Sequence, residues 1–270
     1  MARAIKYTSR ALFFWLVAAG ITPASVGASQ ERAPRPREIC GTVSGGKKLG
    51  GNLLVVVNKR RRHRLASDWE PSDLVAIPRR YMMPEREGQI RRKALRPLKK
   101  MLKAARRRGF RLGVRSAYRS FHTQCITYES KIRRYGRKHA ARYSAKPGHS
   151  QHQLGTTVDI SSPRLNWELT GKLAKRRDGR WLAKNSWRYG FVLSYPKNRE
   201  RATGYAFEPW HFRYVGKEIA KKIFASGLVP DGYLSACTGK KRPGKCRSKK
   251  RQKKLAKVKR RKNRKKKRFF

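Results

Sequence analysis

The sequence is poor in acidic side chains. Its 270 residues include 15 Asp or Glu against 71 Lys or Arg, which gives a formal net charge of +56. A charge this one-sided is not typical of an ordinary globular protein, and it favours binding to polyanions such as nucleic acid, lipopolysaccharide or teichoic acid. The hydrophobic content of 38% still supports a folded part.

Long apolar runs are missing except at the N-terminus. Residues 11–20 (ALFFWLVAAG) follow Arg3, Lys6 and Arg10, and Val26 and Ala28 stand as the −3 and −1 residues of a cleavage site. This layout is typical of a secretory signal peptide, and the run is short for a membrane span. The sequence therefore predicts an exported protein, periplasmic or extracellular, without a stable span after cleavage. An uncleaved N-terminal anchor is the alternative.

Cysteine is also scarce, and no CxxC pair occurs among the four residues. That spacing speaks against a zinc site made of cysteines. Thiols of exported proteins tend to form disulfides, and four cysteines allow three pairings. Cys237 with Cys246 is the easiest closure and would leave Cys40 for Cys125, but the sequence does not choose among the three.

The chain lacks a repeating strand–helix unit, a glycine-rich phosphate loop and internal repeats. These absences favour an α+β fold with a small, mostly antiparallel sheet flanked by helices. Apolar periodicity predicts strands at 53–57, 110–114, 156–160, 191–195 and 207–216, helices at 89–108, 121–142 and 216–227, and a partly helical 165–189 with a turn at 178–179.

Four regions follow from these patterns. We expect a signal peptide at 1–28, an extension and linker with short strands at 29–84, a catalytic domain at 85–238 and a disordered tail at 239–270. Residues 240–270 hold 20 Lys or Arg in 31 positions and no acid. We expect this tail to bind an anionic envelope polymer, with nucleic acid as the alternative partner and a merely solubilising role as the simplest reading.

The region 148–160 (GHSQHQLGTTVDI) suggests a metal site. A zinc hydrolase uses three protein ligands from His, Asp or Glu and leaves one position for water. His152, Asp159 and the more distant His211 can supply that set, and Gly155 permits a turn between the first two. Glu208 stands three residues before His211, near enough to act as a base without being a ligand.

Three blocks together resemble a known family. Residues 116–120 (SAYRS), 148–160 and 208–216 (EPWHFRYVG) are similar to the signature blocks of the VanY-type D-alanyl-D-alanine carboxypeptidases. That family belongs to the zinc peptidases that include lysostaphin-type enzymes and have a hedgehog-like fold. The resemblance covers about residues 85–228. It implies Zn²⁺ as the cofactor and peptidoglycan peptides as the substrate.

The resemblance also implies roles for individual residues. His152, Asp159 and His211 would bind the metal, Glu208 would be the general base, and Arg119 would face the substrate's carboxylate or its oxyanion. Gln124 and Ser150 match positions that line the family's pocket.

The function expected from the resemblance is that of an exported, monomeric zinc D,D-carboxypeptidase that cleaves the terminal D-alanyl-D-alanine bond. An L,D-carboxypeptidase or an endopeptidase of the same group is an alternative. A non-catalytic basic envelope-binding protein with a peptidase-like fold is another.

Overall fold

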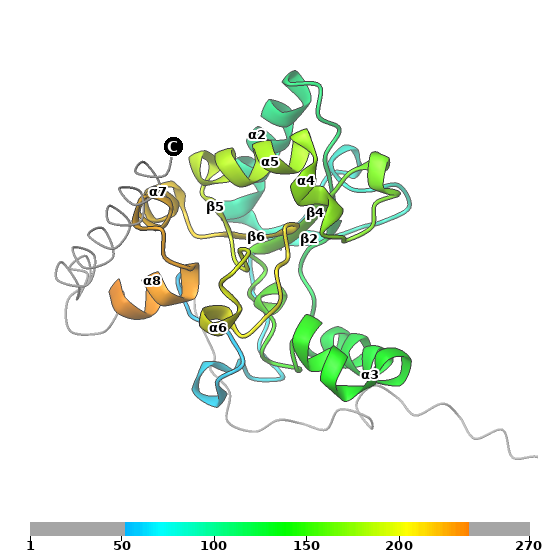
Figure 1. Cartoon of the computed structure of the whole chain (residues 1–270), viewed down its shortest axis with the longest axis vertical. Helices are drawn as coiled ribbons and strands as arrows, with labels where there is room; N and C mark the ends of the chain where they lie inside the picture. The colour runs from blue at the N-terminus through cyan, green and yellow to red at the C-terminus, as the bar shows by residue number, and fades with distance from the viewer. Residues whose placement is uncertain (1–51, 238–270) are drawn as a thin grey trace, which may run out of the picture. The chain divides into compact units, whose positions relative to one another are not determined.

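A computed structural model describes residues 52–237 of the chain (Figure 1). The expected signal peptide, the basic tail, Cys40 and Cys246 lie outside these residues. Cys125 is disulfide-bonded, and the proposed pairing of the cysteines stays a prediction. None of the helices within 52–237 has the length and apolarity needed to cross a bilayer.

A four-stranded antiparallel sheet carries the fold. Its strands are β3 (Gly113–Ser116), β4 (Thr157–Ser161), β6 (His211–Tyr214) and β5 (Phe191–Leu193), in that spatial order. A second, two-stranded sheet pairs β1 (Leu74–Ala76) with β2 (Gln89–Arg91). Small antiparallel sheets mixed with helices confirm the expected α+β class.

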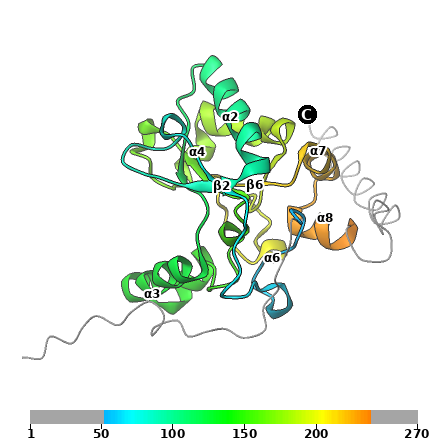
Figure 2. The same cartoon turned by 180° about the vertical axis from the view of Figure 1, so that it is seen from behind.

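Helices α2 (Arg92–Arg107) and α5 (Arg177–Asn185) cover one face of the larger sheet (Figures 1 and 2). Leu98 and Met101 of α2 and Leu182 of α5 share a core with Val158 and Ile160 of β4. Since successive strand residues point to opposite faces, Asp159 between those two points away from the helices. The sheet thus has an apolar side under the helices and a side left for polar chemistry.

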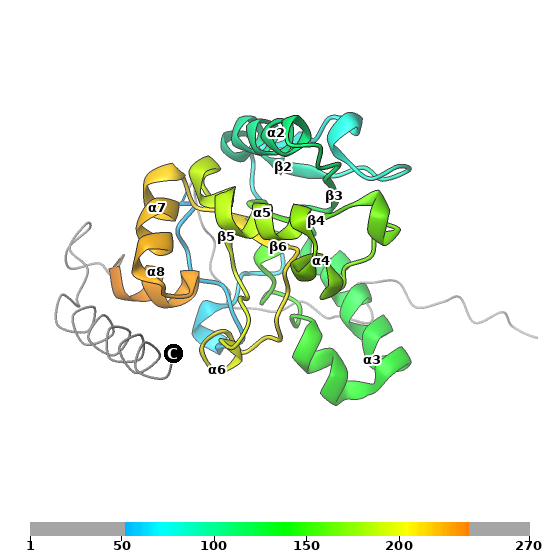
Figure 3. The ribbon, with the colours of Figure 1, turned by 45° about the horizontal axis from the view of Figure 1, so that its top comes forward.

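Helices α7 (Lys217–Ser226) and α8 (Pro230–Cys237) lie beside β5, whereas α3 (Phe121–Tyr143) stands apart from the sheet (Figure 3). Ala220 and Ile223 of α7 and Leu234 of α8 form a second core with Val192 of β5. Helix α3 has a break at Gly136, where φ is 80°. The short elements are η1 (Arg61–His63), η2 (Arg79–Tyr81), η3 (Gln151–Leu154), η4 (Pro163–Leu165), α4 (Lys172–Lys175), η5 (Ser186–Tyr189) and α6 (Glu200–Thr203).

Three local expectations were wrong. Residues 53–57 form no strand, because the buried guanidinium of Arg213 takes the carbonyls of Leu53 and Val55 at 2.9 and 2.5 Å. Residues 89–91 are a strand and not a helix, because they pair with 74–76. Residues 178–179 lie in the first turn of α5 and not in a turn between elements; the glycine is needed there for close packing, because a Cβ on Gly179 would stand 2.0 Å from the Leu173 carbonyl.

Candidate metal centre

The register of the sheet places two of the expected ligands opposite each other. Asp159 of β4 pairs with His211, the first residue of β6, and Ser116 of β3 faces Asp159 from the other side. Directly opposite residues on antiparallel strands have Cβ atoms about 4.5–5.5 Å apart. Asp159 and His211 therefore meet although 52 positions separate them in the sequence.

His152 reaches the same place from the 3-10 turn η3. Ser150 begins this turn, and its hydroxyl accepts a hydrogen bond from the His152 N–H at 3.2 Å. Gly155 ends the turn with a φ of 66°, in the left-handed region that glycine enters without strain. The expected turn between His152 and Asp159 is thereby confirmed.

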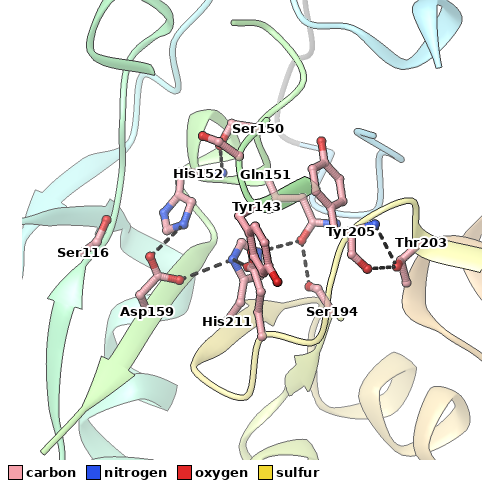
Figure 4. A network of polar contacts seen from close by, with 12 residues as sticks. Ser116, Tyr143, Ser150, Gln151, His152, Asp159, Ser194, Thr203, Tyr205 and His211 are labelled. Carbon is pink, nitrogen blue, oxygen red and sulfur yellow. Dashed lines mark hydrogen bonds and ion pairs between the residues drawn. The ribbon is translucent and has the colours of Figure 1, made fainter. Parts of the chain in front are cut away.

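The three side chains converge in a buried cluster (Figure 4). His152 Nε2 lies 3.2 Å from Asp159 Oδ2, and His211 Nδ1 lies 3.3 Å from Asp159 Oδ1. One ligand atom from each residue lies within 4.8 Å of the other two. The rings of His152 and His211 stand nearly perpendicular, at 89°. The cluster can therefore hold one metal ion.

The outer nitrogen of each ring is already engaged. His152 Nδ1 lies 2.6 Å from the Ala117 carbonyl, and His211 Nε2 lies 3.2 Å from Gln151 Oε1. Both partners are acceptors, so each outer nitrogen carries the proton and each inner nitrogen keeps a lone pair toward Asp159. Hydrogen bonds of this kind fix the orientation of histidines that bind metals.

The donor set fits zinc. Two neutral imidazole nitrogens and one carboxylate leave a fourth position of a tetrahedron for water. Asp159 Oδ1 is buried and makes no hydrogen bond within the described residues, which is costly for a carboxylate oxygen unless an ion or water binds it. Burial alone would raise the pKa of Asp159, whereas positive charge at its two histidine neighbours, or on a metal ion bound between them, lowers it well below its ordinary value.

Glu208 lies at the edge of this cluster. Pro209 follows it in a turn that the His211 N–H closes onto the Glu208 carbonyl at 3.2 Å, so both side chains turn the same way. Glu208 Oε2 lies 3.5 Å from His211 Nδ1. The residue is only 7% exposed, and burial raises the pKa of its carboxyl to about 7.

Arg119 lies near enough to Asp159 and Glu208 to feel their charges, but it pairs with neither. Its guanidinium donates to Gln124 Oε1 at 2.8 Å and to Ser116 Oγ at 2.9 Å. Burial lowers the pKa of Arg119, while the nearby charges of Asp159 and Glu208 raise it. No carboxylate within residues 52–237 lies close enough to pair with it.

Gln124 and Ser150 are both buried. Gln124 holds Arg119 through its oxygen and donates to the Ala145 carbonyl at 2.7 Å. Ser150 supports the backbone of His152. Their contact with substrate, as the family resemblance implies, stays a prediction.

A polar network behind His211 escaped sequence reasoning. Gln151 Oε1, which faces His211, also accepts from Ser194 Oγ at 2.7 Å, and Gln151 Nε2 donates to Asp231 Oδ1 at 3.3 Å. Asp231 lies 4.0 Å from Arg213, and burial raises its pKa. No local pattern marks these residues, because they come from four separate elements.

A cavity of about 390 Å³ lies between α3 and the loops that carry Lys59 and Lys146. Its lining includes Lys59, Tyr128, Lys146 and His149. Burial lowers the pKa of Lys59, and the charge of Glu208 raises it, so that ammonium lies near the metal cluster. The cavity therefore holds a cation that the charge of Glu208 reaches, although neither Glu208 nor the metal cluster lines it.

Replacing Gln151 with leucine is expected to weaken zinc binding about 10- to 100-fold, because it removes the acceptor that orients His211. The matched control is Gln153→Leu, since Gln153 is equally buried in the same turn but bonds Ala66 and Trp69. Zinc affinity measured by competition with a chelator separates the two variants. Equal losses in both would show that Gln151 acts only on stability.

Comparisons with known proteins agree with this geometry. The family model described as "VanY: D-alanyl-D-alanine carboxypeptidase" matches residues 87–217. YodJ of Bacillus subtilis, a protein named for carboxypeptidase activity, is 39% identical over 185 residues, which are 68% of this chain and 67% of that protein. The chain belongs to the VanY family.

Two solved structures of VanY-family relatives add the fold and the metal. The LdcB LD-carboxypeptidase superposes with a TM-score of 0.63 at 37% identity, over 71% of this chain and 93% of that one. A VanY D,D-pentapeptidase mutant in complex with Zn(II) superposes with a TM-score of 0.54 at 32% identity, over 67% and 98%. This VanY-family chain is accordingly a zinc metallopeptidase of the D-Ala-D-Ala carboxypeptidase type, as the resemblance implied.

Proposed function

We propose that this chain is an exported D,D-carboxypeptidase that removes the terminal D-alanine from peptidoglycan stem peptides. The observation that carries the proposal is Arg119, a half-buried cation near the metal cluster whose hydrogen-bond partners are both neutral. A guanidinium free of carboxylates can grip the free C-terminus of a peptide with two parallel hydrogen bonds.

His152, Asp159 and His211 would hold the zinc ion through Nε2, a carboxylate oxygen and Nδ1. When bound there, zinc lowers the pKa of water toward about 7 and stabilises negative charge on the scissile carbonyl. The chain's own residues supply the ligand geometry, the proton acceptor and the substrate's counter-charge.

Glu208 would move the proton. Its pKa of about 7 matches a group that must first accept a proton and then return it. The carboxylate would take the proton from the attacking water and donate it to the leaving amine. Its position 3.5 Å from His211 Nδ1 places it beside the metal cluster.

Cations around Glu208 suit an anionic substrate end. Lys131 and Lys59 both feel the charge of Glu208, and burial lowers the pKa of each. With Arg119 they surround the base with positive charge. A carboxypeptidase needs such charge to recognise a free carboxylate, whereas an endopeptidase cleaves where none is present.

Replacing Arg119 with lysine is expected to lower kcat/KM for a pentapeptide about 10- to 100-fold, because an ammonium cannot make the paired hydrogen bonds. Zinc affinity should stay within about threefold of the original. Steady-state kinetics measure the fall in kcat/KM, and competition with a chelator measures the zinc affinity. A fall in the first without a fall in the second is the signature of carboxylate recognition by Arg119. A variant that loses zinc and activity together would contradict carboxylate recognition.

An L,D-carboxypeptidase is the second candidate, favoured by the likeness to the LdcB LD-carboxypeptidase. Both activities require a free carboxylate near Arg119 and differ in the residue before the cleaved bond. Mass spectrometry of three digested muropeptides separates them. Loss of D-alanine from the pentapeptide supports the D,D assignment, loss from the tetrapeptide supports the L,D assignment, and cleavage only of cross-linked dimers would overturn both.

The terminal regions bear on location. A leader at 1–28 would export the chain, and the basic residues of 239–270 would bind an anionic envelope polymer near its substrate. Hydrolysis of peptidoglycan peptides is consistent with action outside the cytoplasm. Secretion of a tagged full-length chain, with the mature N-terminus sequenced, tests both the export and the cleavage after Ala28.

A further inference from the structure

A second cavity lies away from the metal cluster, at the ends of α2, β4 and α4. It has a volume of about 460 Å³, within the range of ligand sites. Seven basic side chains and one carboxylate line it. Arg177 and Arg180 of the lining belong to α5, which packs on the apolar face of the sheet, whereas Asp159 points to the opposite face.

Six of these cations have no carboxylate partner among residues 52–237. Only Arg176 pairs, with Asp178 at 3.3 Å, and the same carboxylate also accepts the Gly179 N–H. The ion pairs of residues 52–237 include none of the other lining cations. The unpaired six are Arg108, Arg111, Arg164, Lys175, Arg177 and Arg180.

Ser162 points to a ligand independently of these charges. It lines the cavity, is 1% exposed, and its hydroxyl has no hydrogen-bond partner in the described structure. The residue precedes η4 but does not cap it. A buried hydroxyl without a partner is costly, and an oxyanion in the cavity would satisfy it.

We propose that this basic pocket binds phosphate groups of an anionic cell-envelope polymer, so that the folded domain holds the wall through a site of its own. Guanidinium groups match phosphate oxygens with paired hydrogen bonds. The pocket would bind the polymer in addition to the expected basic tail. This proposal does not depend on which peptide bond the chain cleaves.

The lining favours a phosphodiester polymer without bases, such as poly(glycerol phosphate), over nucleic acid or a lipid surface. Binding of single strands commonly uses exposed aromatic rings on which bases stack. The one aromatic residue here, Phe110, is half-buried and packs against Trp181 with ring centroids 6.2 Å apart. The exposed large hydrophobic side chains within 52–237, which could enter a membrane, all lie elsewhere.

The test compares two triple variants of the full-length chain. Arg111→Gln, Arg164→Gln and Arg177→Gln remove three charges from the pocket. Lys217→Gln, Lys221→Gln and Lys222→Gln remove three exposed charges from α7. Affinity for poly(glycerol phosphate) at physiological salt should fall at least about tenfold in the first and less than threefold in the second.

Further arms make the proposal falsifiable. Ser162→Ala leaves the charge unchanged and should weaken polymer binding at least about threefold. The affinity for single-stranded DNA of equal charge should fall equally in the two triple variants. Hydrolysis of whichever soluble muropeptide the unmodified chain cleaves should be unchanged, which also shows that the variants fold. Equal polymer losses in both triples would reduce the effect to net charge, and a pocket-specific loss of DNA or of anionic vesicles would assign the site to those partners; each overturns the proposal.

Discussion

Replacing Glu208 with glutamine is expected to lower kcat about 10³-fold while leaving zinc bound. The amide has nearly the same shape, but it cannot accept the proton of the attacking water, and general acid–base catalysis contributes about 10²- to 10⁴-fold. Glu208 lies beside His211 without belonging to the three-residue cluster. Single-turnover kinetics on a pentapeptide and metal analysis of the same sample measure both quantities.

The matched control for this variant is Glu200→Gln, an exposed carboxylate at the start of α6. Its activity should equal that of the unmodified chain. If the Glu208 variant kept more than about a tenth of the original kcat with zinc bound, proton transfer would have to run through another group.

Replacing Asp159 with asparagine is expected to weaken zinc binding more than 100-fold and to abolish hydrolysis. Asp159 is the one anionic donor of the cluster and bridges both histidines at 3.2 and 3.3 Å. Loss of a residue that only orients a ligand already costs about 10- to 100-fold in affinity, so loss of the ligand's charge should cost more. Zinc retained after dialysis is the readout.

Thermal unfolding gives a second readout that needs no activity. A metal that binds only the folded state stabilises it in proportion to the logarithm of its concentration over Kd. Zinc should raise the Tm of the unmodified chain and leave that of the Asp159 variant unchanged. Asp178→Asn, another buried aspartate in an ion pair far from the cluster, should keep the shift; an equal loss there would indicate general destabilisation.

The metal cluster could be predicted from the sequence because its parts follow local rules. The alternation of β4 sets the face on which Asp159 lies, Gly155 marks the turn after His152, and the Glu208–Pro209 turn orients the base. The family resemblance then joined segments that spacing alone could not connect. The α+β class followed from the absence of a repeating strand–helix unit.

The hydrogen bonds that orient the metal ligands from behind could not be predicted in the same way. Gln151 meets Ser194 and Asp231 only after the chain has folded, and no periodicity links them. The error at 53–57 has the same origin. An apolar run predicts a strand, but the fully buried Arg213, 158 to 160 positions away, takes its carbonyls instead.

The basic pocket could not be predicted from the sequence for a different reason. Its arginines come from the segment after α2, from η4, from the residue after α4 and from α5, where each looks like one more surface cation in a chain of charge +56. The composition predicts that the chain attracts polyanions, but it does not show where on the molecule they bind. The place becomes visible only with the buried hydroxyl of Ser162 and the sparse pairing of the surrounding cations.

Release of D-alanine from a soluble pentapeptide by metal-stripped and zinc-reconstituted protein tests the central claim most directly. We predict that the stripped chain is inactive and that one equivalent of zinc restores hydrolysis. Restoration should fail in the Asp159→Asn variant. Hydrolysis that persists without metal, or that one equivalent of zinc does not restore, would contradict a zinc peptidase centred on His152, Asp159 and His211.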